Sequence, residues 1–257
     1  MPEGDTIFRA ARTLHGVLAQ KPLVRFEAPG LEGPPPGPGE VVESVRAKGK
    51  HLLIRFSGGR TLHSHMGMNG SWHVYRPGQR WQKPRHRARV VVEAGGWVAV
   101  CFSPMTLELI GDAEAAVHER LSSLGPDLCL PDADLQEALR RMRARPNMQL
   151  GVALLDQRIA CGVGNVFKSE ALHAAREDPF ALVRDVSDAR LRTLIEIAAV
   201  QLRSNLGSGR RTTVEEGLAV YKRSGRDCRR CSATIRMLHQ GKPPRSTYWC
   251  PGCQPGR

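Results

Sequence analysis

Near the start of the chain, apolar residues recur every three or four positions, which is the spacing of one face of a helix. Asp5 and Thr6 precede this run and can cap the N-terminus of a helix. The apolar positions are Ile7, Phe8, Ala11, Leu14 and Leu18. The pattern predicts a first helix that buries one face and holds the start of the chain in a fixed place.

After a proline-rich surface loop at residues 28–39, the pattern changes to short runs rich in β-branched and aromatic residues. Gly58-Gly59 separates two of these runs and is a hairpin signal. The runs predict strands at Val41–Arg46, His51–Phe56, Thr61–Met66, Ser71–Val74, Arg89–Val92 and Trp97–Phe102. We interpret residues 41–109 as an antiparallel β-sandwich.

Helical spacing returns beyond a link through residues 123–127. The predicted helices are Ala133–Arg143, Met148–Gln157, Val166–Ala175 and Asp188–Leu202, and a cysteine-bearing hairpin closes the chain. The expected fold class is therefore α+β with two domains, a helix plus an antiparallel β-sandwich followed by a helical domain.

The chain is strongly basic, with a net charge of +13 over 257 residues. Residues 201–257 hold 12 Lys and Arg against 3 Asp and Glu, so +9 of that charge lies in the last fifth. Such a surface predicts a polyanionic partner, nucleic acid before membrane, although a basic surface kept for solubility is the alternative. No apolar run has the length of a membrane span, and no signal peptide is recognised.

Four of the seven cysteines have the spacing C-x2-C-x18-C-x2-C. Cys228, Cys231, Cys250 and Cys253 in this spacing predict four thiolates around one zinc ion, one pair on each side of a hairpin. Four sulfur ligands leave no open position, so the predicted zinc is structural. Because the cysteine number is odd and four have metal-ligand spacing, we expect a reducing, cytoplasmic compartment rather than a disulfide framework. Arg245, between the two pairs, is placed for contact with a phosphate or is simply a solvated arginine.

Two glycines, Gly162 and Gly164, permit a tight turn between two predicted helices. Asn165 follows and is expected to cap the second helix, where backbone N–H groups favour an anion. We predict that a DNA phosphate lies there, with Lys168 nearby.

Three features of the β region have candidate chemistry. Lys50 precedes an apolar strand and is expected at a strand or hairpin start. His63 and His65 share one strand without a carboxylate beside them, which favours polar contacts over a metal site. Met68, in a glycine-flanked loop, is either a core residue or a wedge that fills the gap left by an extruded base.

The start of the chain carries a further candidate, Pro2 followed by Glu3. Removal of Met1 would leave a free secondary amine on Pro2, and a terminal amine has a pKa of about 8, far below that of lysine. Such an amine can condense with a sugar aldehyde carbon to a Schiff base, while the Glu3 carboxyl transfers protons. The alternative is an ordinary polar chain end.

Taken together, these motifs resemble bacterial formamidopyrimidine-DNA glycosylase/endonuclease VIII enzymes. The motifs are Met1–Thr6, Gly49-Lys50, Gly162–Asn165 and Arg245…Tyr248–Gln254, in that order along nearly the whole chain. The Gly4-Asp5-Thr6 continuation looks like the endonuclease VIII branch. The resemblance implies a catalytic domain at 1–122, a linker at 123–131, a helix–two-turn–helix domain at 132–218 and a zinc finger at 219–257.

The resemblance also implies a role for each matching residue. Pro2 matches the Schiff-base nucleophile that attacks C1′ of a damaged nucleotide, and Glu3 the proton donor that opens the sugar ring. Lys50 matches the residue that assists β-elimination. The remaining matches concern DNA: Asn165 and His65 for phosphate contacts, Met68 for gap filling, and Arg245 for phosphate binding and δ-elimination.

The implied function is a bifunctional DNA glycosylase/AP lyase of base excision repair that removes mainly oxidised pyrimidines. Its partner is double-stranded DNA with a damaged base or an abasic site, its cofactor is one structural Zn2+, and we expect a monomer. The alternatives are a glycosylase that prefers 8-oxoguanine and formamidopyrimidine, and a catalytically inactive DNA-binding protein. The second void-filling loop departs from the formamidopyrimidine branch, and Met105 and Leu107 are the candidates in it.

Overall fold

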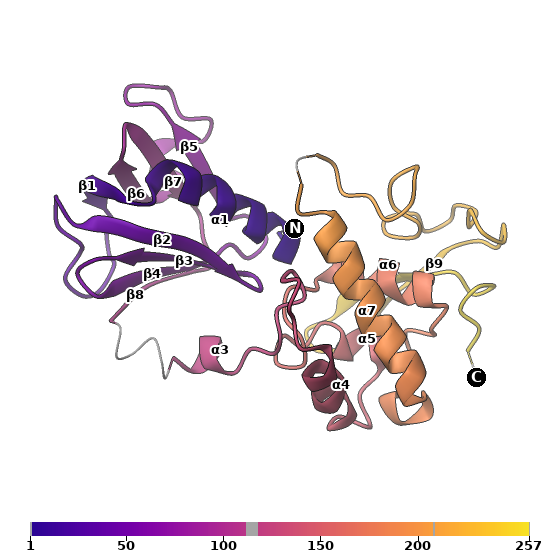
Figure 1. The fold of residues 1–257 in the computed structure, drawn as a ribbon. Coiled ribbons are helices and arrows are strands. Elements are labelled where there is room, and N and C mark those ends of the chain that lie inside the picture. Colours follow the sequence, from indigo (N-terminus) through magenta and orange to yellow (C-terminus); the bar gives the residue numbers. More distant parts are fainter. Residues whose placement is uncertain (1, 112–117, 208, 257) are drawn as a thin grey trace. The chain divides into compact units, whose positions relative to one another are not determined.

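The computed structural model describes residues 2–111, 118–207 and 209–256. The chain divides into two compact units, Met1–Ser122 and Ser123–Arg257 (Figure 1). Within the described ranges, no helix combines the length and the apolar character of a membrane span.

The first unit is a helix with an antiparallel sheet of eight strands in the order β5-β7-β6-β1-β2-β3-β4-β8. Its helices are α1 (Gly4–Leu18) and the short α3 (Glu119–Ser122), with a 3-10 turn at Arg85–Arg87. Its strands are β1 (Lys21–Glu27), β2 (Val41–Lys48), β3 (His51–Phe56), β4 (Arg60–His65), β5 (Ser71–Tyr75), β6 (Ala88–Ala94), β7 (Trp97–Phe102) and β8 (Thr106–Gly111).

Strand β1 joins the two halves of this sheet. Lys21 and Pro22 pair with β2, whereas the strand from Leu23 onward pairs with β6, and the register shifts between Leu23 and Arg25. A strand that changes partner at an irregularity turns a sheet through a corner. The two halves therefore face each other as the layers of the predicted sandwich.

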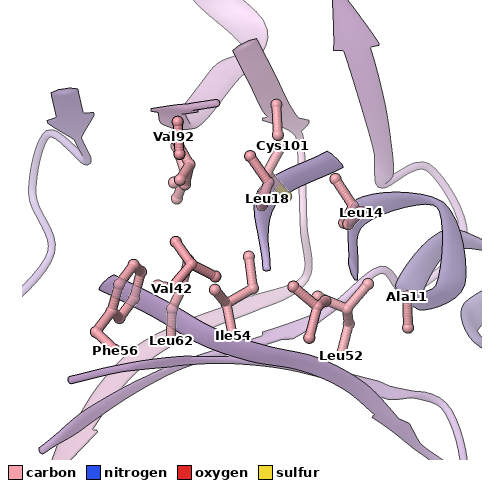
Figure 2. Packing of buried hydrophobic residues seen from close by; sticks show 14 of the residues in the cluster. Ala11, Leu14, Leu18, Val42, Leu52, Ile54, Phe56, Leu62, Val92 and Cys101 are labelled. Atoms are coloured by element: carbon pink, nitrogen blue, oxygen red, sulfur yellow. The ribbon is translucent and has the colours of Figure 1, made fainter. Parts of the chain in front are cut away.

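The core of the unit lies between these layers. Figure 2 shows Ile54 and Leu62 pointing from one half toward Val92 and Cys101 of the other, with Leu14 of α1 beside them. These side chains are at most 1% exposed. Because apolar burial is the main favourable term in folding, this core fixes α1 against the sheet.

All six predicted strands are present, but β1 and β8 were not predicted. Only Leu23 of β1 is buried, and a strand with Pro22 and several charges lacks the apolar alternation that marks a strand. The predicted cap of α1 at Asp5 and Thr6 was wrong, since the helix begins at Gly4 with Glu3 in the cap position. Asp5 lies buried in the first turn.

The second unit combines helices with a two-stranded hairpin. Its helices are α4 (Leu135–Arg143), α5 (Leu150–Ala153), α6 (Asn165–Ala175) and α7 (Asp188–Ser204), with a 3-10 turn at Val183–Asp185. The hairpin strands are β9 (Arg236–Gln240) and β10 (Arg245–Trp249). Helix α5 is shorter than the predicted Met148–Gln157, and α6 packs on both α7 and β10. The hairpin therefore packs on α6 and forms part of the second unit.

Candidate functional site

Helix α1 and strand β2 run in opposite directions. The Gln20 N–H donates to the Val42 carbonyl at 2.7 Å, and the Val45 N–H donates to Nδ1 of His15 at 3.2 Å. From His15 back to Glu3 the helix covers about 18 Å, and from Val45 to Lys50 the strand covers roughly 17 Å. Glu3 and Lys50 therefore lie at the same end of the first unit.

Glu3 is completely buried at the start of α1. Its carbonyl accepts from the N–H groups of Thr6 at 3.0 Å and Ile7 at 3.1 Å, so the backbone around it is held by the helix. Pro2 directly before it is half-buried. Met1, whose removal the sequence argument requires, lies outside the described residues.

Lys50 occupies the two-residue turn between β2 and β3, as the pairing of Lys48 with His51 shows. Gly49 before it has a φ of 57°, in the left-handed region that favours glycine. The turn places Lys50 at the tip of a hairpin, in agreement with the sequence-based expectation.

His65 ends strand β4 opposite His51, with the two rings 4.9 Å apart. Burial lowers the pKa of His65 to about 4, and the Lys50 ammonium contributes to this lowering. The Gly67 N–H donates to Nδ1 of His65 at 3.3 Å, so the neutral ring has its proton on Nε2. The Nε2–H group can therefore donate a hydrogen bond to an acceptor such as a phosphate oxygen.

The two loops predicted to fill a gap in DNA lie next to each other. The Met105 N–H donates to the His65 carbonyl at 2.8 Å, and a Cβ on Gly67 would stand 2.8 Å from Cβ of Met105. Met68 and Met105 are 68% and 69% exposed, whereas Leu107 packs against the core. Of the two candidates in the second loop, Met105 has the exposure that a wedge requires.

In the second unit, α6 and the hairpin meet at Asn165. Gly164 takes the cap position of α6, so the prediction of Asn165 as the capping residue was wrong and Asn165 is the first helical residue. Its Nδ2 donates to Oγ of Ser246 at 3.0 Å. Arg245, the neighbour of Ser246, is exposed at the start of β10.

Lys168 is not at the surface. Its side chain is completely buried, and Nζ donates to the carbonyl of Ser246 at 3.1 Å and to Oγ1 of Thr247 at 2.7 Å. The expected contact with a phosphate does not fit this burial. Lys168 instead fastens α6 to β10 and so positions Asn165 beside the hairpin.

Glu170 is a positioning residue to which the sequence argument gave no role. Its buried carboxylate accepts from the backbone N–H groups of Ala219 at 2.7 Å, Val220 at 2.9 Å and Tyr221 at 2.8 Å. The Thr213 hydroxyl donates to the same group. The segment before the first cysteine pair is thereby held on α6. The sequence around Glu170 has no signal for this role, because its partners lie 43 to 51 positions further along the chain.

The four predicted metal ligands converge at the base of the hairpin. Their sulfur atoms lie within 4.8 Å of one another. Cys231 Sγ is 3.4 Å from the sulfurs of Cys250 and Cys253, and Cys228 Sγ is 3.8 Å from that of Cys253. Four sulfurs at 2.3 Å from one ion are roughly 3.8 Å apart, so the cluster fits a tetrahedral metal. It closes a small core with Val220 and Ile235.

Comparison with known proteins decides the family. Residues 1–103 match the model of the formamidopyrimidine-DNA glycosylase N-terminal domain, and residues 124–216 match that of the formamidopyrimidine-DNA glycosylase H2TH domain. The chain belongs to the formamidopyrimidine-DNA glycosylase family.

Relatives of this family cover the whole chain. A probable endonuclease 8 2 of Streptomyces coelicolor is 42% identical over 100% of this chain and 95% of its own. A DNA-(apurinic or apyrimidinic site) lyase Nei2 of Mycolicibacterium smegmatis is 36% identical over 99% of both chains. The chain is accordingly an enzyme of the DNA glycosylase and AP lyase class.

Solved structures share the fold of this family member. A Lactococcus lactis formamidopyrimidine-DNA glycosylase bound to DNA with an AP site has a TM-score of 0.83 and 20% identity, covering 99% of this chain and 100% of its own. The N-terminal family match includes Pro2, Glu3 and Lys50, and the H2TH match includes Asn165. The cysteine hairpin lies beyond both matched ranges.

Proposed function

We propose that this protein is a bifunctional DNA glycosylase/AP lyase that acts through the amine of Pro2. The observation that carries the proposal is the placement of Glu3. A fully buried acid stands directly after Pro2, on a helix start that lies at the same end of the unit as Lys50. A nucleophile, a proton donor and a second amine at one end of a rigid domain are what an imine-forming lyase requires.

In the proposed reaction, the neutral Pro2 nitrogen attacks C1′ of the extruded nucleotide. The bond between C1′ and the base breaks, and the base leaves with its electron pair and takes up a proton. The Glu3 carboxyl donates a proton to the ring oxygen, so the sugar opens to an iminium ion on Pro2. The positive nitrogen acidifies the C2′ hydrogen, and Lys50 assists its removal and the loss of the 3′ phosphate.

A second elimination then expels the 5′ phosphate, and hydrolysis frees Pro2. We assign Arg245 to the phosphate in this step, because its exposed guanidinium lies at the hairpin tip. The products are a one-nucleotide gap with phosphate ends and an unsaturated sugar fragment.

The DNA contacts are assigned to three further residues. Asn165 beside the hairpin and the Nε2 donor of His65 suit phosphate oxygens. Met68 suits the space that the extruded nucleotide leaves, because an exposed apolar side chain can enter a base stack. Solved structures of the same fold are complexes with abasic-site or damaged-base DNA, which supports this partner.

We assign one structural Zn2+ to the four cysteines, since four thiolates are the donor set that zinc prefers. We further propose oxidised pyrimidines as the main substrates, because the relatives matched over the whole chain are named endonuclease 8. These relatives are bacterial, which supports action on chromosomal DNA in the cytoplasm.

Borohydride trapping tests the role of Pro2. Reduction should bind the protein covalently to DNA with an abasic site. A Pro2→Gly variant should be trapped far less, because a primary amine gives an imine without a permanent positive charge. A chain with one residue inserted between Met1 and Pro2 should also be trapped far less, since the Pro2 nitrogen becomes a non-nucleophilic amide.

Pro22→Gly, in the exposed part of β1, is the matched control and should be trapped like the wild type. Equal trapping of wild type and the insertion variant would overturn the assignment of Pro2. Mass spectrometry of the active protein should find Met1 removed. A duplex panel with oxidised pyrimidines, 8-oxoguanine and formamidopyrimidine separates the two enzyme branches, and binding without trapping would indicate a DNA-binding protein.

A further inference from the structure

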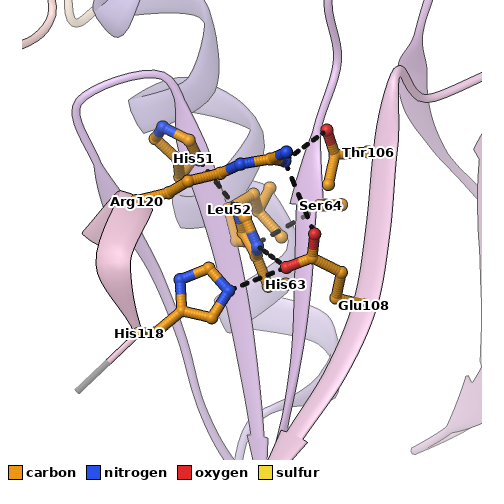
Figure 3. A network of polar contacts seen from close by, with 8 residues as sticks. All are labelled: His51, Leu52, His63, Ser64, Thr106, Glu108, His118 and Arg120. Carbon is orange, nitrogen blue, oxygen red and sulfur yellow. Dashed lines mark hydrogen bonds and ion pairs between the residues drawn. The ribbon is translucent and has the colours of Figure 1, made fainter. Parts of the chain in front are cut away.

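Three side chains outside the proposed catalytic residues converge on the outer part of the first sheet: His63 on β4, Glu108 on β8 and His118 just before α3 (Figure 3). His63 and Glu108 are direct partners in the β4–β8 register. Nδ1 of His63 lies 3.2 Å from Oε2 of Glu108, and Nε2 of His118 lies 2.8 Å from the same oxygen. The three potential ligand atoms all lie within 4.8 Å of one another.

Two imidazoles and one carboxylate form a common ligand set for divalent transition metals in sites with three protein ligands. At metal–ligand lengths of 2.0–2.2 Å, tetrahedral ligand atoms are about 3.3–3.6 Å apart. The two observed separations, 2.8 and 3.2 Å, are somewhat shorter than this range. An ion can therefore enter with small side-chain movements and without a change of the strands.

The surroundings of the cluster match those of a metal site. Nδ1 of His51 lies 2.7 Å from Nε2 of His63 and can accept its N–H when Nδ1 of His63 binds an ion. Nη1 of Arg120 lies 3.5 Å from Oε1 of Glu108, which leaves Oε2 for the ion. Ligand residues in metal sites are oriented by such outer partners.

Burial points the same way. The His63 side chain is fully buried, and those of His118 and Glu108 are 17% and 33% exposed. Nδ1 of His118 is buried and has no hydrogen-bond partner within the described part of the chain, so it can take up the ring proton when Nε2 binds an ion. The partial exposure of Glu108 and His118 leaves the cluster accessible to an ion from solvent.

We propose that His63, Glu108 and His118 bind a divalent transition-metal ion, with Zn2+ as the probe, at a site separate from the four cysteines. On binding, the ring proton of His63 moves from Nδ1 to Nε2 and that of His118 moves from Nε2 to Nδ1, so each ring stays neutral and its unprotonated nitrogen binds the ion. The fourth position is left for water.

The ion would fasten the end of the first unit to its sheet. His118 lies shortly before the boundary at Ser122, and Nζ of Lys48 donates to the Leu121 carbonyl at 2.7 Å in the same segment. A metal at His118 would add a second attachment, between β4, β8 and this segment.

Zinc counting on the full-length protein tests the site. Each variant is dialysed against Zn2+ and then against metal-free buffer, and bound zinc is measured by mass spectrometry. The wild type should hold one equivalent more than His118→Ala and Glu108→Gln. Titration should show affinity at this site weakened at least about tenfold in both variants. Glu108→Gln keeps the size of the side chain, so it remains informative if His118→Ala fails to fold.

His73→Asn is the matched control, because His73 lies in the same unit on β5 and bonds to Gln82 and Ser71 outside the cluster. It should hold as much zinc as the wild type. If the wild type, His118→Ala and Glu108→Gln bind the same number of zinc ions per protein molecule, the proposal is overturned, whatever that number is. Because the readout is a difference between variants, it is independent of zinc at the cysteines and of the proposed reaction.

Discussion

Nδ2 of Asn165 donates a 3.0 Å hydrogen bond to Oγ of Ser246, across 81 positions of the sequence. This bond places the first residue of α6 beside the tip of the cysteine hairpin, where Arg245 is exposed. Two motifs that the sequence offers separately as phosphate contacts therefore meet within the second unit, with Asn165 buried and Arg245 exposed.

Arg245→Ala should weaken DNA binding and reduce the steepness of its salt dependence. Loss of one phosphate contact changes the log–log slope by roughly 0.9. The same variant should accumulate the product of the first elimination. Fluorescence anisotropy at several salt concentrations and gel analysis of the cleaved strand measure both effects. Arg236→Ala, on the exposed face of β9, is the control, and an equal change in both variants would contradict a specific role.

Lys168→Met should destabilise the second unit by about 1–3 kcal/mol, because two buried acceptors lose their donor. The acceptors are the Ser246 carbonyl and the Thr247 hydroxyl. Urea unfolding measures the change, with the exposed Lys222→Met as control. The salt dependence of DNA binding should have the same log–log slope as that of the wild type. A slope reduced as in Arg245→Ala would indicate that Lys168 does contact a DNA phosphate.

Met68→Ala and Met105→Ala should leave the folded state unchanged within about 0.5 kcal/mol, because both side chains are exposed. Excision of a damaged base from duplex DNA should slow in each variant and most in the double variant, since the gap left by the base stays unfilled. Strand cleavage at an abasic site in a single strand should change little. Val24→Ala, exposed on β1, controls for loss of apolar surface.

Removal of the metal from the four cysteines should unfold the hairpin, because the small core there contains Cys228, Cys250 and Cys253 themselves. DNA affinity should fall, as the hairpin no longer supports Asn165 and Arg245. Circular dichroism and anisotropy before and after chelation, followed by added Zn2+, measure loss and recovery. Cys250→Ser should reproduce the chelated state, whereas Cys101→Ser, in the other unit, should not.

Glu3→Gln should lower base excision by about 10²–10⁴-fold, the usual contribution of a general acid. The amide keeps the size of the buried side chain, so the fold should persist. Single-turnover kinetics on a duplex with an oxidised pyrimidine measure the rate. Glu27→Gln, exposed at the end of β1, should match the wild type. A full rate with Glu3→Gln would remove Glu3 from the mechanism.

The parts of the fold with regular local patterns were predictable from the sequence. Helix α1 and strands such as β3 and β7 show the apolar spacing of their class, and the cysteine spacing predicted the cluster of four sulfurs. The order of the motifs along the chain also predicted the family, and the two family matches confirm it.

Features that depend on pairing of distant segments were not predictable. The sequence around His63 holds no carboxylate, which argued against a metal site, yet the β4–β8 pairing places Glu108 opposite it. Similarly, a lysine near a predicted helix start looked available to phosphate, but packing of β10 on α6 buries Lys168. Local spacing contains no information on which strand lies next to which.

The change of partner within β1 also has a consequence for folding during synthesis. The strand from Leu23 to Glu27 finds its partner only in residues 91–94 of β6. During synthesis on the ribosome, nearly one hundred residues must therefore emerge before β1 can pair with β6 and the sandwich of the first unit can form. Until then one edge of β1 stays open, and its exposed charges, including Lys21 and Arg25, keep nascent chains from joining to one another there.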